Sequence, residues 1–267
     1  MKTDLLLDPF GARWTHMRDA AVAAEAEGFD GVWTYDHLAG SVHNTSMVLE
    51  CWTTLTAIAA SVPRITIGSM VLNVANRDPG TLAVMAATLQ EVSGGRLLLG
   101  IGAGGGRVTP YAAEQEALGR TVEPDPIRRA AVEQTAGLLR EVWSGERDGV
   151  SGFLQPDPAP PIIIGAFGPL MAVIAGHAGD GINIPGMHGT REVLLATARE
   201  SHRAAARNPD AFVGTASASL TPEWVRRDSA YRRELESIGV DRLVLFARPR
   251  DLSAIRQAGR MLRGEDG

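Results

Sequence analysis

Two polar residues that can take part in proton transfer follow one of the short apolar runs in this sequence. The run 31–34 leads directly into Tyr35-Asp36-His37. An imidazole titrates near neutral pH, so His37 is a candidate to transfer a proton or to stabilise a developing charge. Asp36 can hydrogen-bond a ligand hydroxyl or orient the histidine; the structural alternative is a polar loop whose aspartate caps a turn. We predict His37 and Asp36 as the catalytic residues.

A run of glycines marks a second candidate site. Residues 100–106 read Gly-Ile-Gly-Ala-Gly-Gly-Gly and satisfy the pattern G-x-G-x-x-G. That pattern binds dinucleotides when it occupies the first strand-to-helix turn and opens directly into a helix. Here three apolar runs come first, and residues 107–110 begin no clean helix. We therefore interpret the turn as main chain without side chains, against which a flat ring can lie; a flexible loop is the alternative.

A third candidate site is the turn Gly165-Ala166-Phe167-Gly168-Pro169, which opens a stretch of helical period. Glycines at the start of a helix leave N–H groups free for a phosphate, and the helix dipole favours the negative charge. Proline fits the first helical turn because no N–H is needed there. An ordinary capped turn between a strand and a helix is the alternative.

Composition and charge argue against several functional classes. The formal net charge of −5 is unlike that of a general nucleic-acid binder. Cys51 is the single cysteine, which rules out an internal disulfide and points to a reducing compartment. The N-terminal apolar stretch is far too short for a signal peptide or a membrane span, so we expect a cytoplasmic protein with no membrane partner. No set of His, Cys, Asp and Glu has metal-ligand spacing, so we predict no metal site.

Apolar runs alternate with amphipathic stretches along the whole chain, and this alternation predicts a parallel sheet covered by helices. We predict strands at 5–7, 31–34, 65–72, 96–101, 161–164, 180–184, 211–217 and 241–246. Helices are predicted around 17–28 and at 50–60, 81–92, 128–143, 169–178, 191–207, 223–237 and 252–262. These units predict a single α/β domain over residues 1–267, a (β/α)₈ TIM barrel. Its ligand site is expected where the strands end, and the candidate residues all fall there.

Several segments together resemble the luciferase-like monooxygenase superfamily, and they occur in the family's order over roughly the first two-thirds of the chain. The matching segments are 23–37 (AAEAEGFDGVWTYDH), 50–55 (ECWTTL), 64–69 (RITIGS), 93–96 (SGGR), 99–104 (LGIGAG), 143–146 (WSGE), 164–165 (IG) and 175–181 (AGHAGDG). Asp36-His37, the turn 165–169 and Ala175-Gly176 are closest to the branch that uses the deazaflavin coenzyme F-420.

The resemblance implies a luciferase-like barrel that binds either FMN or coenzyme F-420, with hydride transfer at C-5 of the deazaflavin. It implies that His37 is the acid or base and that Asp36 lies near the ring. Ser69-Met70 occupies the place of a non-proline cis peptide that backs the ring in the family. The cofactor-binding residues that the resemblance implies are Asp36, Ser69, Met70, Val71, Gly102, Ala103, Gly104, Gly165, Ala166, Phe167 and Gly168, the last four holding the phosphate.

Two departures from the family pattern bear on the substrate pocket. Family members often carry a glutamate or another polar residue just after the glycine turn, where this chain has Gly105-Gly106-Arg107. An acid or base there is therefore missing or supplied from elsewhere. The chain is also shorter between Ala211 and Asp241, so the pocket is expected to be open or closed by a partner subunit. We expect pocket walls from Tyr35 and from residues 42–47, 107–111 and 187–188.

The leading hypothesis is an oxidoreductase that transfers a hydride between coenzyme F-420 and a small organic substrate. The alternatives are an FMN-dependent monooxygenase, a non-redox barrel isomerase or aldolase acting on a sugar phosphate, and a non-catalytic flavin-binding module. Lys2 is the only lysine, so the aldolase has no obvious Schiff-base residue. From the resemblance we also expect a homodimer. The sequence does not identify the substrate.

Overall fold

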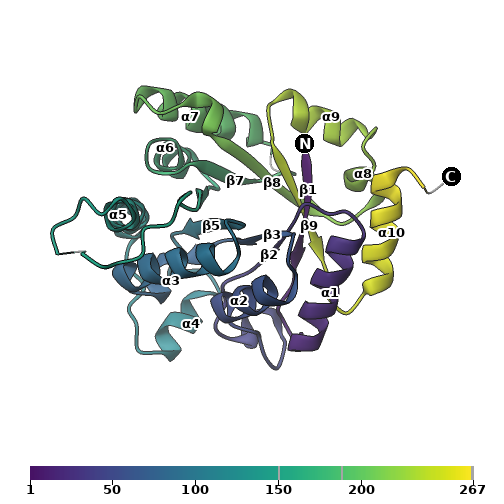
Figure 1. Ribbon diagram of the computed structural model, residues 1–267, viewed down its shortest axis with the longest axis horizontal. Helices are drawn as coiled ribbons and strands as arrows, with labels where there is room; N and C mark the ends of the chain where they lie inside the picture. Colours follow the sequence, from purple (N-terminus) through teal and green to yellow (C-terminus); the bar gives the residue numbers. More distant parts are fainter. Residues whose placement is uncertain (150, 188, 266–267) are drawn as a thin grey trace.

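The computed structural model describes residues 1–149, 151–187 and 189–265, and these form a closed parallel barrel surrounded by helices (Figure 1). β1 pairs with both β2 and β9, and β3 pairs with β5, so the sheet closes on itself. The barrel strands in the described residues are β1 (Lys2–Leu7), β2 (Gly31–Thr34), β3 (Thr66–Ser69), β5 (Leu97–Gly102), β6 (Ile162–Gly165), β7 (Gly181–Pro185), β8 (Val213–Ser219) and β9 (Arg242–Ala247). The predicted (β/α)₈ TIM barrel is confirmed.

Helices follow the strands and cover the outside of the barrel. They are α1 (Trp14–Ala26), α2 (Cys51–Ser61), α3 (Pro79–Val92), α4 (Ala112–Ala117), α5 (Asp125–Ser144), α6 (Pro169–Ala178), α7 (Arg191–Ala204), α8 (Pro222–Val225), α9 (Ala230–Ser237) and α10 (Leu252–Arg263). Local chemistry sets several of their starts. Asp78 accepts a hydrogen bond from the N–H of Thr81 and Pro79 fills the first turn of α3, both strong start signals. No helix in the described part of the chain is long and apolar enough to cross a membrane.

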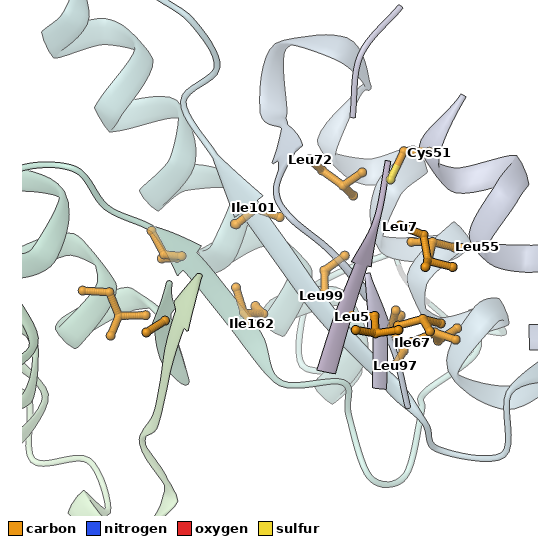
Figure 2. Close-up of a cluster of buried hydrophobic side chains, with 14 of the residues drawn as sticks. Leu5, Leu7, Cys51, Leu55, Ile67, Leu72, Leu97, Leu99, Ile101 and Ile162 are labelled. Atoms are coloured by element: carbon orange, nitrogen blue, oxygen red, sulfur yellow. The ribbon is translucent and has the colours of Figure 1, made fainter. Parts of the chain in front are cut away.

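Strand side chains alternate between an outer and an inner core, as the two-residue period of a strand requires. Leu5 and Leu7 of β1 face the helices, whereas Leu6 between them faces the barrel interior. The outer core is the larger, and Figure 2 shows part of it, including Leu7 of β1 with Cys51 and Leu55 of α2. The inner core consists of Leu6, Trp33, Met70, Ile163 and Val244. The barrel is therefore packed with side chains rather than open as a pore.

A buried ion pair closes the lower end of the barrel, where the strands begin. Arg242 reaches the carboxylate of Asp4 through Nε at 2.7 Å and Nη2 at 2.8 Å. The indole Nε1 of Trp33 donates to the same carboxylate at 2.8 Å. Gly68 makes room for that indole, because a Cβ at Gly68 would lie 2.3 Å from the ring. These side chains fill part of the end where the strands begin, and the ligand sites of (β/α)₈ barrels lie at the opposite end, where the strands finish.

The structure differs from the predicted elements in three places. The predicted strand 65–72 is interrupted: β3 ends at Ser69, and a short strand β4 (Leu72–Asn73) follows and pairs with β5. The predicted helix 223–237 is two helices, because Ser229 accepts a hydrogen bond from the N–H of Arg232 and so begins α9 anew. Residues 107–126, over which no strand or helix is predicted, contain α4.

Candidate functional site

The two glycine turns lie side by side at the end of the barrel where the strands finish, which we call the mouth. β5 ends at Gly102 and β6 ends at Gly165, and the two strands pair in register just below, at Ile101 and Ile164. Val71 contacts both turns: a Cβ at Gly102 would lie 2.5 Å from its Cγ2, and a Cβ at Gly165 would lie 3.1 Å away. The turns therefore form one surface, with Val71 between them.

His37 lies at the same mouth, and its partner is Glu114 from α4. The Nδ1 atom of His37 is 3.1 Å from Oε2 of Glu114 and 3.2 Å from Oε1. Oε1 also accepts hydrogen bonds from the backbone N–H groups of Leu38 and Ala39, both at 3.1 Å. The carboxylate is buried, whereas 18% of the His37 side chain is exposed. Glu114 thus fixes the imidazole at the surface of the mouth.

The charge state of Glu114 follows from these hydrogen bonds. Burial acts to raise the pKa of Glu114, but the hydrogen bonds from His37 and from the N–H groups of Ala39 and Leu38 outweigh it and lower the pKa below the ordinary glutamate value. The carboxylate is therefore ionised at neutral pH and can only accept hydrogen bonds. His37 faces a fixed negative charge.

Aromatic rings surround His37. Its imidazole centroid is 5.1 Å from the ring of Phe10, 5.0 Å from that of Tyr111 and 6.2 Å from that of Tyr35. Phe10 also packs against His43, at 4.3 Å. Burial, Asp8 and Tyr111 raise the pKa of Tyr35 to about 12, so its phenol stays protonated and available as a donor. The rings make a semi-apolar wall on one side of the mouth.

A cavity of about 380 Å³ opens next to Phe10. Its lining comes from the segment after β1 and the segment after β9, namely Asp8, Phe10, Ala12, Arg248, Pro249, Arg250 and Asp251. Phe10 lines this cavity and also packs against His37, whereas His37 itself is not part of the lining.

Asp36, the second predicted catalytic residue, bonds to other partners than His37. Its carboxylate accepts two hydrogen bonds from Arg77, at 2.9 Å each, and one each from the N–H of Asn73 and the amide of Asn76. The Asp36 side chain is fully buried. The carboxylate that orients the histidine is Glu114, while Asp36 ties the end of β2 to β4 and the turn that follows it. Arg77 also bonds to Glu50, whose carboxylate caps α2 through the N–H groups at 52 and 53.

The segment Ser69-Met70-Val71 contains a non-proline cis peptide, one bond later than expected. The sequence placed it at Ser69-Met70, and in the structure it joins Met70 to Val71. Ser69 is buried and donates its hydroxyl to the carbonyl of Gly100 at 2.8 Å, and Met70 is buried in the inner core. Val71 is the partly exposed member of the three and is the one that reaches the mouth.

The glycine turn after β5 is held from outside the barrel. Arg128 of α5 donates from Nη1 to the carbonyls of Ala103 and Gly104, at 2.8 and 2.6 Å. Gly104 has φ +67°, and a Cβ there would lie 2.4 Å from the side chain of Asn73. The side chain of Val71 fills the space beside Gly102.

The turn after β6 offers an exposed backbone at a helix start. Gly168 precedes α6 in an extended conformation, and a Cβ on it would meet no atom within 4 Å. No side chain of the described residues caps this helix start. Phe167 is largely exposed, whereas Ala166 is fully buried and donates its N–H to the carbonyl of Asn183. The open N-terminus of α6 is suited to a phosphate.

Of the expected pocket walls, Tyr35, Tyr111 and His43 come together around His37. Met187 is exposed beyond β7. His188 lies outside the residues that the structure describes. Glu114, Arg77 and Arg128 were not anticipated. Each lies in or beside a segment without clear periodicity. The only indication in the sequence was that no acidic residue follows the glycine turn, which suggested an acid or base from another segment such as the one that carries Glu114.

The fold and its strand ends define a (β/α)₈ barrel with a histidine–carboxylate pair at the mouth. The chain belongs to the luciferase-like monooxygenase family, whose sequence profile matches residues 4–254.

Among curated proteins, an F-420-dependent glucose-6-phosphate dehydrogenase of Kineococcus radiotolerans is 32% identical over 205 residues, covering 72% of this chain and 59% of the relative. An F-420-dependent hydroxymycolic acid dehydrogenase of Mycobacterium tuberculosis is 34% identical over 200 residues, covering 71% of this chain and 54% of the relative. The match spans little more than half the length of these relatives.

Among solved structures, an F-420-dependent secondary alcohol dehydrogenase in complex with an F-420–acetone adduct superposes with a TM-score of 0.81 at 17% identity. The match covers 100% of this chain and 99% of the other. At this identity the likeness is one of fold.

Proposed function

We propose that this protein is an oxidoreductase that uses coenzyme F-420 and transfers a hydride between it and a small substrate carrying a hydroxyl or carbonyl group. The observation that carries the proposal is the placement of His37, held by Glu114, at the same mouth as the bare N-terminus of α6. The named curated relatives, which are F-420-dependent dehydrogenases, support the cofactor. The substrates named for these two relatives, glucose-6-phosphate and a hydroxymycolic acid, both carry a hydroxyl group, which supports the substrate class.

The residues at the mouth fit a phosphate-bearing flat cofactor. The N–H groups at the start of α6, with the space above Gly168, hold the phosphate. Gly102, Ala103 and Gly104 provide main chain beside the ring and its polyol chain, and Val71 supports the ring. Asp36 acts through Arg77 by holding β4 in place rather than by touching the ring.

The chain's own contribution to the reaction is proton transfer and orientation. Coenzyme F-420, when bound, supplies the hydride acceptor or donor. When an alcohol is oxidised, Nε2 of His37 accepts the hydroxyl proton, and the carbon that bears the hydroxyl gives up its hydride to the cofactor. A carbonyl compound remains. In the opposite direction His37 returns that proton to the carbonyl oxygen. Phe10 and Tyr111 pack near the imidazole and limit water around it.

An FMN-dependent monooxygenase is the second candidate. A monooxygenase of Streptomyces bottropensis has the same fold, with a TM-score of 0.73 at 17% identity. The same turns would then hold the FMN phosphate. The His37–Glu114 pair favours the dehydrogenase, because alcohol oxidation needs a base at the substrate hydroxyl.

Separate titrations of the purified protein with F-420 and with FMN, followed by fluorescence, test the proposal. We expect F-420 to bind at least about 10-fold more tightly than FMN, a difference of about 1.4 kcal/mol. Tighter binding of FMN would replace the proposal with the monooxygenase. Binding of neither would favour a barrel enzyme acting on a sugar phosphate.

We propose further that residues 1–267 form one domain, that two copies form a homodimer, and that the protein is cytoplasmic. Cys51 is buried and free, and burial raises the pKa of its thiol, which suits a reducing compartment. If the chain is one domain, urea should unfold it in a single transition, and two transitions would contradict this. Light scattering should give twice the chain mass, and a monomeric mass would contradict the homodimer. Cell fractionation tests the location, and recovery outside the cytoplasmic fraction would contradict it.

A further inference from the structure

Both carboxylate oxygens of Glu114 approach Nδ1 of His37, Oε2 at 3.1 Å and Oε1 at 3.2 Å, but only Oε1 also accepts the backbone N–H groups of Leu38 and Ala39, at 3.1 Å each. The side chain comes from α4, which is distant in sequence from β2 but covers its end. Glu114 therefore joins α4 to the loop after β2, and His37 is one of the residues of that loop to which it bonds.

An ionised carboxylate has no proton to donate, so the hydrogen bond between Glu114 and His37 requires the proton to be on Nδ1. A neutral imidazole with its proton on Nδ1 carries its lone pair on Nε2. Nε2 makes no hydrogen bond within the part of the chain that the structure describes. It is the ring atom left available for a ligand.

We propose that Glu114 is the positioning residue of His37, which fixes the Nδ1–H tautomer and so makes Nε2 the proton acceptor for the substrate hydroxyl. The proton-transfer role rests on the proposed function, whereas the tautomer does not depend on it. The carboxylate that this chain lacks directly after the glycine turn is supplied in this way from α4. The side chain of Tyr111, one turn before Glu114, packs near the imidazole and reinforces its orientation.

Replacing Glu114 by glutamine tests this because the N–H groups of Leu38 and Ala39 require an acceptor at the Oε1 position. The amide oxygen can keep those two hydrogen bonds, and the amide NH₂ then takes the place of Oε2, the atom nearer to Nδ1. An NH₂ group donates to Nδ1 and so favours the imidazole proton on Nε2. The variant retains shape and packing but presents the wrong ring nitrogen to the substrate. Glu116→Gln on the exposed side of the same helix is the matched control.

The direct measurement is the tautomer of His37 in protein with ¹⁵N-labelled histidine and no cofactor, from long-range ¹H–¹⁵N correlation spectra at pH 8.5. The His37 signals are assigned from their loss in His37→Gln. We expect a protonated Nδ1 and an unprotonated Nε2 in the wild type and in Glu116→Gln, and the reverse in Glu114→Gln. A wild-type ring protonated mainly on Nε2 would overturn the proposal, and this result needs no folded variant.

Kinetics give the second readout. We expect Glu114→Gln to lower kcat by at least about 100-fold with less than about a 3-fold change in KM and in the Kd for F-420, because a wrong tautomer impairs proton transfer but not binding. Glu116→Gln should retain wild-type kcat. Unchanged kcat in folded Glu114→Gln would overturn the proposal. If F-420 fails to bind while the Nδ1–H tautomer is observed, the proposed function fails and the orientation of His37 by Glu114 stands.

Discussion

The two ends of the barrel each bury a carboxylate, and the partners of the two carboxylates differ. At the lower end Asp4 is paired with Arg242, which is 7% exposed, and with the indole of Trp33. At the mouth Glu114 is paired with His37, which is 18% exposed. A guanidinium keeps its charge at every physiological pH, and both of its bonds at the lower end point to Asp4. An imidazole can gain or lose a proton, and Nε2 of His37 makes no hydrogen bond within the described part of the chain.

This difference separates a structural ion pair from one suited to chemistry. The Asp4–Arg242 pair is buried among strand side chains, and its cation does not titrate at physiological pH, so its role is to hold the barrel closed. The Glu114–His37 pair uses a fixed charge to orient a titratable group at a surface. The comparison predicts that changes at the lower end affect stability, while changes at the mouth affect turnover and binding.

The largest effect on stability is expected from Arg242→Met. The substitution leaves Asp4 buried without its cation, which costs about 3–5 kcal/mol in comparable pairs. Urea unfolding of the purified protein measures the loss. Arg18→Met, which removes an exposed pair with Asp19, is the control and should change stability by less than about 1 kcal/mol. Equal effects of the two substitutions would mean that the lower end is not the structural anchor described above.

The largest effect on turnover is expected from His37→Gln. Loss of a positioned acid or base lowers kcat by about 10²–10⁴-fold. The amide of glutamine can still donate to Glu114, so the unfolding midpoint in urea should remain close to that of the wild type. Steady-state kinetics with F-420 and a series of small alcohols measure the loss. A His37→Gln protein that retains wild-type kcat would remove the histidine from the mechanism.

Two alanine substitutions at the mouth sharpen the comparison between the two glycine turns. At Gly168 a methyl group meets no protein atom, so Gly168→Ala should fold normally and lose about 10-fold in F-420 affinity by intruding on the phosphate. At Gly102 a methyl group meets Val71, so Gly102→Ala should also lose about 1–3 kcal/mol of stability through overpacking. Fluorescence titration and urea unfolding measure the two effects. Full affinity in Gly168→Ala would place the phosphate elsewhere.

The smallest effect concerns pH. The pKa of Glu114 is lower in the folded protein than the ordinary glutamate value, so its contribution to stability is fully present above that value and is lost as the pH falls through the lowered pKa. Wild type should exceed Glu114→Gln by about 1 kcal/mol at pH 7, from charge-assisted hydrogen bonds. Urea unfolding between pH 7 and pH 3 should show this gap closing only below about pH 4.3, the ordinary glutamate value. A gap that stays unchanged down to pH 3 would contradict the assigned ionisation.

The barrel was predictable from the sequence because each strand is a short apolar run bounded by turn residues, and the pattern repeats. The glycine turns and His37 were predictable as mouth residues for the same reason, since strand ends meet at one edge. Glu114 was not predictable. It lies 77 positions from His37 in a segment broken by prolines, and only the folded chain brings the two together. The role of Asp36 was also hidden, because its partner Arg77 follows the short strand β4 rather than a predicted element.

The break at Met70-Val71 shows a further limit of sequence periodicity. The β-branched and apolar residues from 65 to 72 read as one strand, yet the backbone turns at the cis bond and places Val71 against two glycine turns. Nothing in the local residue types distinguishes Val71 from its apolar neighbours. Its position depends on Gly102 and Gly165, which leave the space that its methyl groups fill.

We propose that the mouth binds the deazaflavin with its phosphate on α6 and its ring within reach of His37. A crystal structure of the protein soaked with F-420 tests this binding mode most directly. We expect the phosphate at the N–H groups beside Gly168, the ring against Val71, and the Nε2 atom of His37 facing the substrate side of the ring. A ring bound away from Val71, or a phosphate bound anywhere other than the start of α6, would contradict it.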